Sequence, residues 1–323
     1  MIPKVIVDTD VGLDDAMALF MLIKAHKEGH IDLVAITTVH GNTTVDNVCK
    51  NTVRTLEATG VTGIPVFKGA HSSLVEPFIH KEPFHGWDGF GDVVFETVSD
   101  VSILEEEHAV NGLIRLVNTH PGEISIVAVG PLTNLALAMR MDPMFASKMK
   151  SLYIMGGNTE GVGNITIAAE FNFHCDPEAA FIVLKNTVVP TVIVAWELCY
   201  KHCEISWEWR KKKLGGLNTP QSQLLNRIES QYMEKETFPT WLICDQIAAA
   251  AYIDPGVITR SSEHFATVEL TGRFTRGMMV VDHGKITKEK PNVTIVERVD
   301  VELIKDMLLW GADDSNSTYK VPV

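Results

Sequence analysis

The stretch KVIVDTDVGLDDAMALF, residues 4–20, decides the fold and carries four carboxylates within eight positions. Its first part, Lys4–Asp8, predicts a short buried strand, and the apolar run Ala16–Leu22 predicts a helix. The acids therefore crowd a strand-to-helix turn at the carboxyl end of a strand, where open α/β sheets bind ligands. These acids are Asp8, Asp10, Asp14 and Asp15.

Helix capping explains only part of this acidic cluster. Aspartates in a first helical turn complement the helix dipole, which accounts for Asp14 and Asp15. Asp8 and Asp10 leave the strand itself and need another explanation. Four anions this close either have raised pKa values or share a cation, and a hard divalent ion with oxygen ligands is the simplest partner. The turn therefore predicts a metal site.

Strands and helices alternate along the first two thirds of the chain. Strands are expected at Lys4–Asp8, Leu33–Val39, Ile64–Phe67, Ile124–Val129, Leu152–Met155 and Thr191–Trp196. Helices are expected at Asp14–His26, Asp46–Thr59, Ala109–Thr119, Leu132–Met141 and Pro177–Lys185, the last with Asp176 as its cap. This alternation predicts an α/β fold with a mainly parallel open sheet and helices on both faces, a Rossmann-like arrangement.

The last third is expected to elaborate the same domain, so that residues 1–323 form one unit. Residues 203–252 are polar and helical, with a loop at Gly215–Pro220, and their basic run Arg210–Lys213 predicts a solvated helix face. The remaining expected elements are a helix at Asp245–Tyr252, paired strands at Ala266–Leu270 and Met278–Val281, a strand at Asn292–Val299 and a helix at Val301–Gly311.

Composition excludes several classes of function. A formal charge of −13 argues against a nucleic-acid backbone or an anionic membrane as partner. The chain has neither a secretory leader pattern nor an apolar run of about 18 residues. Its five cysteines are scattered without a CxxC pair, which argues against structural zinc. A reduced, cytoplasmic protein is the expectation.

Polar loops follow several predicted strands, so they should meet at one edge of the sheet. They include His40-Gly41-Asn42, Gly130–Asn134, Met155–Asn158, Gly163-Asn164 and Glu170-Phe171-Asn172. A further loop, Phe84–Asp92, is rich in glycine and aspartate and carries His85. It is expected to be either a surface loop without a role or a mobile lid that places His85 near a substrate.

These blocks together resemble the inosine–uridine-preferring nucleoside hydrolases. Residues 8–16, DTDVGLDDA, resemble the family's DTDPGxDDA signature. The later blocks match in the family's order: His40-Gly41-Asn42, His85-Gly86, Gly130–Asn134, Met155-Gly156-Gly157, Glu170-Phe171-Asn172 with Asp176–Ala180, and Asp245. The resemblance spans nearly the whole chain, and it implies a ribonucleoside N-ribohydrolase that takes part in purine or pyrimidine salvage.

The resemblance also implies a site. One Ca²⁺ would be held by the carboxylates of Asp10, Asp15 and Asp245 and the main-chain carbonyl of Val129, with the ribose 2′- and 3′-hydroxyls and a water completing its shell. Calcium accepts six to eight oxygens in loose geometry, which suits a diol. Asp10 is our choice of general base. The positions implied for substrate are Asp14, Asn42, Met155, Asn164, Glu170, Phe171, Asn172, His85, Tyr232 and Trp241.

Two positions depart from the family pattern. Val11 replaces the proline of the signature, which costs rigidity but no ligand. Cys244 stands where the family usually has the histidine that protonates the departing base. A thiol with a pKa near 8.5 is a poorer acid at neutral pH than imidazole. Cys244, His85, Tyr232, Trp241 or base stacking could supply leaving-group activation, or Cys244 could simply be a buried small residue.

Two alternatives to hydrolysis stay open at this point. A phosphoribosyl- or ribosyltransferase would need a cationic phosphate site, and the sequence has no P-loop. A catalytically weak, metal-dependent nucleoside- or ribose-binding protein is compatible with Cys244, although intact Asp10 and Asp15 argue against it. Family resemblance further implies a homodimer or homotetramer and leaves the preferred nucleobase undetermined.

Overall fold

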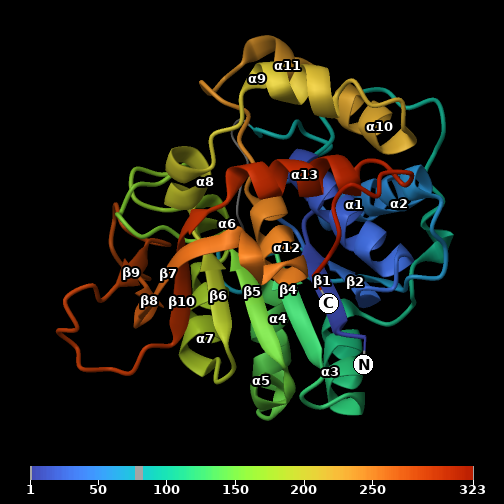
Figure 1. Ribbon diagram of the computed structural model, residues 1–323. Coiled ribbons are helices and arrows are strands. Elements are labelled where there is room, and N and C mark those ends of the chain that lie inside the picture. The colour runs from blue at the N-terminus through green and yellow to red at the C-terminus, as the bar shows by residue number, and fades with distance from the viewer. Residues whose placement is uncertain (1, 77–82, 323) are drawn as a thin grey trace.

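The computed structural model describes residues 2–76 and 83–322, and it shows a mainly parallel sheet with helices on both faces (Figure 1). The sheet has eight strands in the order β3-β2-β1-β4-β5-β6-β10-β7, and β7 alone pairs antiparallel, with β10. The strands are β1 (Lys4–Thr9), β2 (Asp32–Thr38), β3 (Val66–Lys68), β4 (Ile124–Ala128), β5 (Ser151–Met155), β6 (Thr191–Val194), β7 (Ile258–His264) and β10 (Val293–Val299). A separate antiparallel pair joins β8 (Ala266–Val268) to β9 (Met279–Val281). The predicted α/β, Rossmann-like class is confirmed.

Helices cover the sheet in two groups (Figure 1). The first core cluster joins one sheet face to α1 (Leu13–Lys27), α2 (Val45–Thr59), α12 (Asp245–Ile253) and α13 (Val301–Gly311). The second lies on the other face, with α3 (Ala109–Thr119), α4 (Thr133–Met141), α5 (Phe145–Lys148) and α7 (Pro177–Asn186). The remaining helices are α6 (Phe171–Cys175), α8 (Trp196–His202), α9 (Trp207–Trp209), α10 (Pro220–Ile228), α11 (Ser230–Lys235), the π-helix η2 (Arg210–Leu214) and the 3-10 turns η1 (Val101–Ile103) and η3 (Pro255–Val257).

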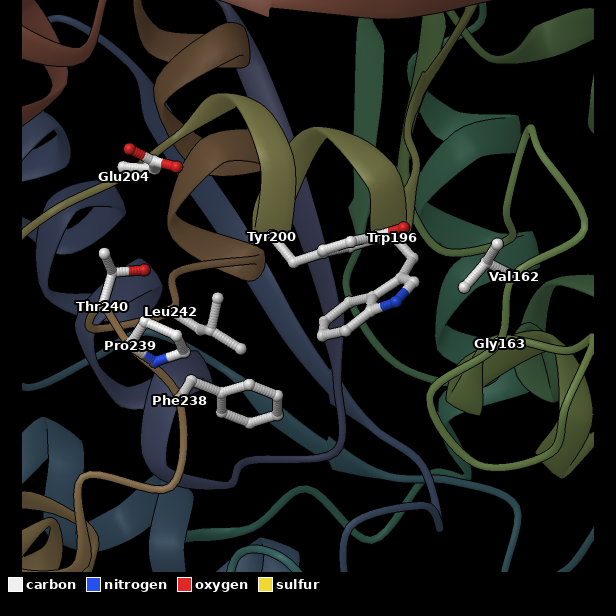
Figure 2. A pocket seen from close by; sticks show the side chains of 9 residues that line it. All are labelled: Val162, Gly163, Trp196, Tyr200, Glu204, Phe238, Pro239, Thr240 and Leu242. Atoms are coloured by element: carbon white, nitrogen blue, oxygen red, sulfur yellow. The ribbon is translucent and has the colours of Figure 1, made fainter.

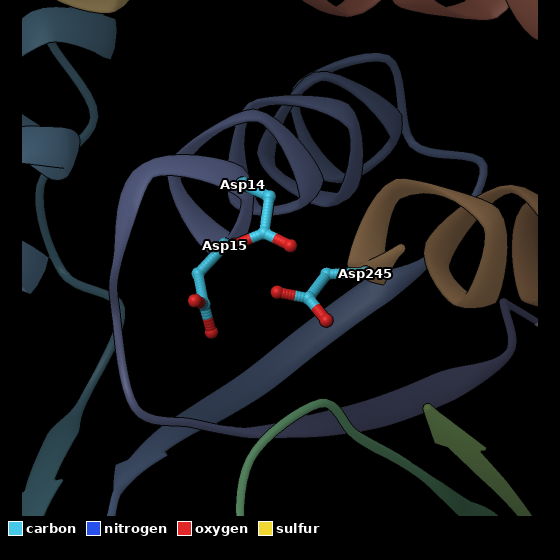
Figure 3. Close-up of side chains that lie close together, drawn as sticks. All are labelled: Asp14, Asp15 and Asp245. Carbon is cyan, nitrogen blue, oxygen red and sulfur yellow. The ribbon is translucent and has the colours of Figure 1, made fainter. Parts of the chain in front are cut away.

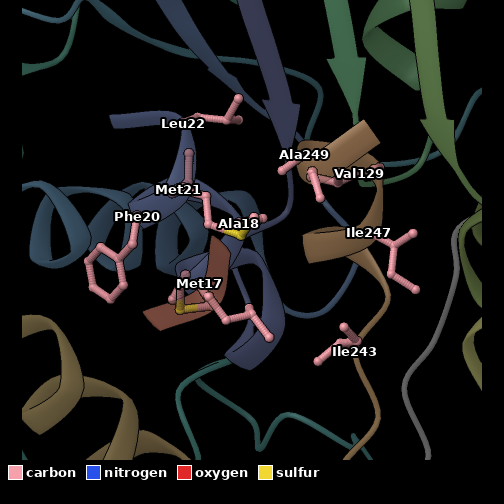
Figure 4. Close-up of a cluster of buried hydrophobic side chains, with 14 of the residues drawn as sticks. Met17, Ala18, Phe20, Met21, Leu22, Val129, Ile243, Ile247 and Ala249 are labelled. Atoms are coloured by element: carbon pink, nitrogen blue, oxygen red, sulfur yellow. The ribbon is translucent and has the colours of Figure 1, made fainter. Parts of the chain in front are cut away.

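Helix α1 is buried on nearly all sides, because it lies between the sheet and two other helices. Its residues Met17 and Met21 pack toward α13 and α12, and Ile247 of α12 belongs to the same cluster (Figure 4). A helix that is apolar all round must be covered on all sides, and α1 is. This packing fixes the start of α1, which carries Asp14 and Asp15, against the start of α12, which carries Asp245.

The strand order places a switch point between β1 and β4. The chain leaves β1 toward α1 on one face and leaves β4 toward α4 on the other, so the two loops part above the carboxyl ends of neighbouring strands. Ligands of open α/β sheets bind at such a crevice. Asp10 follows β1 and Val129 follows β4, so the switch point collects the predicted site.

Most predicted elements are found with ends shifted by a few residues, and three predictions need correction. Strand β7 was missed, because its sequence ITRSSEH is polar and it forms the exposed edge of the sheet. The strand predicted to reach Trp196 ends at Val194, since Trp196 opens α8. Arg210 was expected on a solvated face but is fully buried, while its three lysine neighbours are exposed. Among the described residues, no helix is long and apolar enough to cross a membrane.

Candidate active site

Asp10 lies at the floor of the site, where the chain leaves β1. Its Oδ2 accepts a hydrogen bond from the backbone N–H of Asn42 at 2.7 Å. Gly41 and Gly130 close around the carboxylate, and a Cβ added at these glycines would come within 2.0 and 2.8 Å of its oxygens. The buried Oδ1 has no hydrogen-bond partner among the described residues. Such an oxygen is available to a ligand, and leaving it unpaired would be costly.

Three more carboxylates gather beside it. Asp14, Asp15 and Asp245 each place a carboxylate oxygen within 4.8 Å of the others, and Figure 3 shows them converging from the starts of α1 and α12. Asp15 is held in place, because its Oδ1 accepts from the Thr9 hydroxyl at 2.5 Å and its Oδ2 from the Gly12 N–H at 2.8 Å. The local sequence grouped only the first-turn acids, and the distant Asp245, which the family resemblance implied, is brought to them by the fold.

Burial and the close approach of like charges dominate the electrostatics of this acidic group. Burial first, and then the charge of Asp15, raises the pKa of Asp10 well above its usual range. Burial and the charges of Asp14 and Asp15 do the same to the pKa of Asp245. A cation among these groups would stabilise the ionised forms and reverse this shift. The donor set is entirely oxygen, as hard divalent cations require.

The end of β5 and the start of α6 form the adjoining wall. Asn172 donates from Nδ2 to the carbonyl oxygens of Val129 at 2.9 Å and Met155 at 3.1 Å, so it holds both strand ends together. Glu170 caps α6, since its carboxylate accepts the backbone N–H groups of Gly157, Asn172 and Phe173. Burial raises the pKa of Glu170 to about 7 despite these hydrogen bonds.

A cavity of about 980 Å³ opens above these groups. Nearly all residues implied by the family resemblance line it: Asp14, Asn42, His85, Val129, Met155, Asn164, Glu170, Phe171, Asn172, Tyr232, Trp241, Cys244 and Asp245. Asp10 and Asp15 lie beneath it, each hydrogen-bonded to Asn42, at the main-chain N–H and the side-chain amide respectively. A cavity of this size accommodates a small organic ligand.

His85 reaches the cavity from the glycine-rich loop. Its Nδ1 accepts the backbone N–H of Leu13 at 3.0 Å and lies 3.8 Å from a carboxylate oxygen of Asp14. The loop is anchored, because Asn51 donates to the carbonyl of Asp88 and Phe90 is fully buried. That it moves as a lid stays a prediction. Trp87 of the same loop is 64% exposed and is not part of the cavity wall.

Aromatic side chains form another wall of the cavity. Tyr232 makes edge-to-face contacts with Phe84 at 4.9 Å and with Trp207 at 4.8 Å between ring centroids. Cys244 precedes α12, and the neighbouring Cys199 and burial raise the pKa of its thiol. The thiol therefore keeps its proton at neutral pH. Cys244 directly precedes Asp245, and both line the cavity together with Tyr232.

A buried ion pair supports that wall. Arg210 donates from Nε to Glu229 at 3.0 Å, and both side chains are almost completely buried. The guanidinium also lies over the ring of Trp241, 5.4 Å from its centroid. The π-helical turn after Trp209 carries Arg210 inward, and π-turns are frequent at functional sites. Glu229 itself lines the cavity.

Asp8 does not join the acidic group, although the sequence counted it there. Its Oδ1 accepts from the Thr37 hydroxyl at 2.5 Å and from the Asn134 amide at 2.8 Å. Asp8 shares a sheet face with Ile6, two residues before it, and its hydrogen bond to Asn134 of α4 places it on the α4 side of the sheet. Burial raises its pKa to about 7. The acid is a buried link between β1, β2 and α4.

Several cavity residues escaped sequence reasoning. Phe84, Trp196, Glu229, Phe238 and Leu242 all line the cavity. Trp196 was detectable, because it stands at the carboxyl end of a predicted strand, where the other site loops begin. Glu229 and Phe238 lie in a polar helical region without a periodic signal, and only the folded chain brings them to the site.

Known proteins of one family resemble this chain throughout. The family model described as inosine-uridine preferring nucleoside hydrolase matches residues 5–306. The inosine-uridine preferring nucleoside hydrolase of Crithidia fasciculata is 33% identical over 313 residues, 95% of each chain. A pyrimidine-specific ribonucleoside hydrolase of Escherichia coli is 31% identical over 320 residues, 95% of this chain and 99% of its own. A solved inosine-guanosine nucleoside hydrolase superposes with a TM-score of 0.87 at 31% identity, over 96% of this chain and 98% of its own.

Proposed function

Since the chain belongs to the inosine–uridine-preferring nucleoside hydrolase family, and is therefore a ribonucleoside N-ribohydrolase, we propose that it works with one Ca²⁺. The proposed protein ligands are Asp10, Asp15, Asp245 and the carbonyl of Val129. The unpartnered, buried Oδ1 of Asp10 beside three converging carboxylates is the observation that carries this proposal. When bound, the ion would lower the pKa of a water molecule and would bind the 2′,3′-diol of ribose.

Asp10 is the proposed general base. Its Oδ2 is held by the Asn42 N–H, which leaves Oδ1 to accept a proton from the attacking water. The cleft formed by Gly41 and Gly130 fixes the carboxylate, so little reorganisation accompanies proton transfer. The water adds to C1′ as the bond to the base breaks, and the surrounding anions stabilise the positive charge that develops on the sugar.

Side chains along the cavity floor are proposed to hold the sugar. Asp14, Asn42 and Asn172 lie around the acidic group and face the diol, while Met155 lies beneath the ring at the end of β5. Phe171, Glu170 and Asn164 complete the wall on the β5 side. A ribose bound in this way is oriented by hydroxyl groups at several positions, which positions C1′ next to Asp10.

The departing base is proposed to leave through the aromatic wall. The Nδ1 of His85 accepts a hydrogen bond from Leu13, so a neutral ring carries its proton on Nε2 and can donate it to the base. Cys244 keeps its proton because its pKa is raised, and it is a second donor. Tyr232 and Trp241 supply ring surfaces for stacking.

A panel of ribonucleosides, assayed by release of reducing sugar with and without a calcium chelator, tests this proposal. We expect turnover that the chelator abolishes and added calcium restores. The matching 2′-deoxynucleosides should react at least tenfold more slowly, because they lack one hydroxyl of the diol. Equal rates for both sugars would contradict the calcium–diol arrangement. Ribose binding without turnover would support the binding-protein alternative, although the relatives named above are hydrolases.

We further propose that residues 1–323 act as one domain and that the chain forms a homodimer or homotetramer. A cytoplasmic location is also proposed, because all five cysteines are free, as in proteins of reducing compartments. Light scattering of the purified chain at several concentrations tests the oligomeric state, and a monomer throughout would contradict it.

A further inference from the structure

A second, smaller cavity adjoins the main one, and no step of the proposed reaction uses it. This side pocket has a volume of about 360 Å³ and is lined by Trp196, Tyr200, Phe238, Leu242 and a few neighbouring residues (Figure 2). Trp196, Phe238 and Leu242 line the main cavity as well. The two cavities therefore adjoin along these shared side chains.

The side pocket is built to receive an uncharged, nonpolar group. The rings of Trp196 and Tyr200 lie 5.1 Å apart, and Phe238 meets Trp196 edge-to-face at 6.4 Å between centroids. Of its lining residues, only Glu204 carries a charge, and that residue is exposed. An acid at the rim and no cation in the lining exclude a phosphate as occupant. Aromatic rings favour an alkyl, aryl or thioether group.

The position of the side pocket relates it to the 5′ end of the sugar. The acidic group would engage the 2′,3′-diol, so C1′ and C5′ both project away from it. If the base lies, as proposed above, at the wall around Phe84 and Tyr232, then C5′ would face the loop that carries Asn164. Val162 and Gly163 of that loop line the side pocket.

Helix α8 fixes this loop against the side pocket. Glu197, next to Trp196, accepts the backbone N–H groups of Thr159 and Glu160, both at 2.7 Å. Both oxygens of Glu170 on the same wall already accept backbone hydrogen bonds. A substrate without a 5′-hydroxyl would therefore leave no buried unpaired carboxylate there, which is the costly outcome in polar sites.

We propose that the side pocket binds a nonpolar substituent on C5′, so that the enzyme also hydrolyses 5′-deoxy-5′-alkylthio ribonucleosides. This inference rests on the proposed function. Water would add to C1′, the C1′–N bond would break with its electron pair going to the base, and a proton would reach that base. The products are the free base and 5-deoxy-5-alkylthioribose, and the thioether is unchanged.

The test compares kcat/KM for three substrates that differ only at C5′, in an adenosine series and a uridine series. The substrates are the nucleoside, its 5′-deoxy form and its 5′-deoxy-5′-methylthio form, assayed with the full chain and calcium. In the series that the enzyme accepts, we expect kcat/KM for the methylthio form to be about tenfold higher than for the 5′-deoxy form, because the methylthio group fills a nonpolar pocket. A 5′-phenylthio form should keep this advantage, because the side pocket has room for a ring.

Variants connect this advantage to the side pocket. Tyr200→Ala opens it and Val162→Trp fills it, and each should reduce the ratio of methylthio to 5′-deoxy turnover at least threefold. Tyr200 lies outside the main cavity lining, so turnover of the 5′-deoxy form should be unchanged in Tyr200→Ala. Phe274→Ala, which removes an aromatic ring that is 62% exposed, is the matched control and should leave the ratio unaltered.

The outcomes separate the two proposals. Turnover of ordinary ribonucleosides without a methylthio advantage overturns the side-pocket proposal and leaves the nucleosidase intact. An advantage that Tyr200→Ala does not change also overturns it. N6-benzyladenosine is assayed beside adenosine. If the benzyl group raises kcat/KM, the methylthio group does not, and Tyr200→Ala removes the increase, then the side pocket binds a substituent of the base and the C5′ proposal is wrong. No turnover of any nucleoside overturns both proposals.

Discussion

The acidic group and the aromatic wall belong to one site and are held in place by different means. Asp10 and Asp15 are fixed by backbone N–H groups and tight glycine contacts at the ends of β1 and the start of α1. The aromatic wall depends on side-chain packing between segments far apart in sequence, supported by the buried pair of Arg210 and Glu229. The backbone at the edge of the sheet therefore fixes the carboxylates that would act on the sugar. Side-chain packing determines the shape of the wall proposed to contact the base.

The largest effect is expected from the acidic group itself. Asp10→Ala should lower kcat by about 10²–10⁴-fold, the range for loss of a general base, and further if calcium is lost. Its matched control is Asp8→Asn, because Asp8 lies on β1 just before Asp10 but binds Thr37 and Asn134 instead of joining the site. The control should keep kcat within a few-fold, as measured by sugar release. If both variants lost kcat equally while their thermal unfolding temperatures stayed unchanged, the two acids would not have separate roles.

Breaking the support of the aromatic wall should cost stability. Arg210→Met leaves Glu229 buried without its cation, which should lower the free energy of unfolding by about 3–5 kcal/mol. The double variant Arg210→Met with Glu229→Gln should recover part of that loss, because no buried charge is left unpaired. Urea unfolding measures both. If the single variant is as stable as the unmodified chain, the ion pair does not support the wall.

The effect of Glu170 on stability should depend on pH, because burial raises the pKa of this carboxyl group from 4.5 to about 7. Between these values the folded chain keeps a proton that the unfolded chain releases. Its contribution to stability is therefore full below about pH 4.5 and is lost as the pH rises through 7. The unfolding free energy of the unmodified chain minus that of Glu170→Gln should fall by about 1–3 kcal/mol from pH 5 to 7.5. A difference that rises over this range would show that Glu170 is ionised in the folded chain.

The smallest effect is expected at Cys244. Because His85 is a second donor near the base, Cys244→Ala should lower kcat by less than about tenfold, below the loss typical of a sole general acid. Cys244→His should maintain or raise turnover of purine nucleosides. Initial rates on inosine and adenosine measure both variants. A large loss in Cys244→His would mean that the thiol packs where an imidazole does not fit.

Sequence reasoning located the acidic group far better than the aromatic wall. Strand–helix alternation and the dense aspartates predicted where β1 ends, and loops after parallel strands necessarily share one edge of the sheet. The same reasoning failed for Arg210. A basic run within a polar helix predicts side chains exposed to solvent, but the π-helical turn directs Arg210 into the interior. Strand β7 was missed because an edge strand lacks the nonpolar pattern of buried ones.

Side-chain direction was the other limit. Asp8 and Asp10 look equivalent in sequence, and the two-residue period of a strand would place both on one face. However, β1 ends at Thr9, so Asp8 meets Asn134 from the strand, whereas Asp10 lies in the following loop and is held by Asn42. Asp245 could be placed only through the family resemblance, because its position depends on the packing of α12 against α1. Residues that act through long-range packing carry no local signal.

Calcium titration of the metal-stripped chain by isothermal calorimetry tests the central claim most directly. The account predicts one Ca²⁺ bound per chain, with binding weakened at least tenfold in Asp15→Asn and retained in Asp8→Asn. It also predicts that turnover rises with the bound fraction. Full turnover by a chain that binds no calcium, or equal affinity in Asp15→Asn, would contradict it.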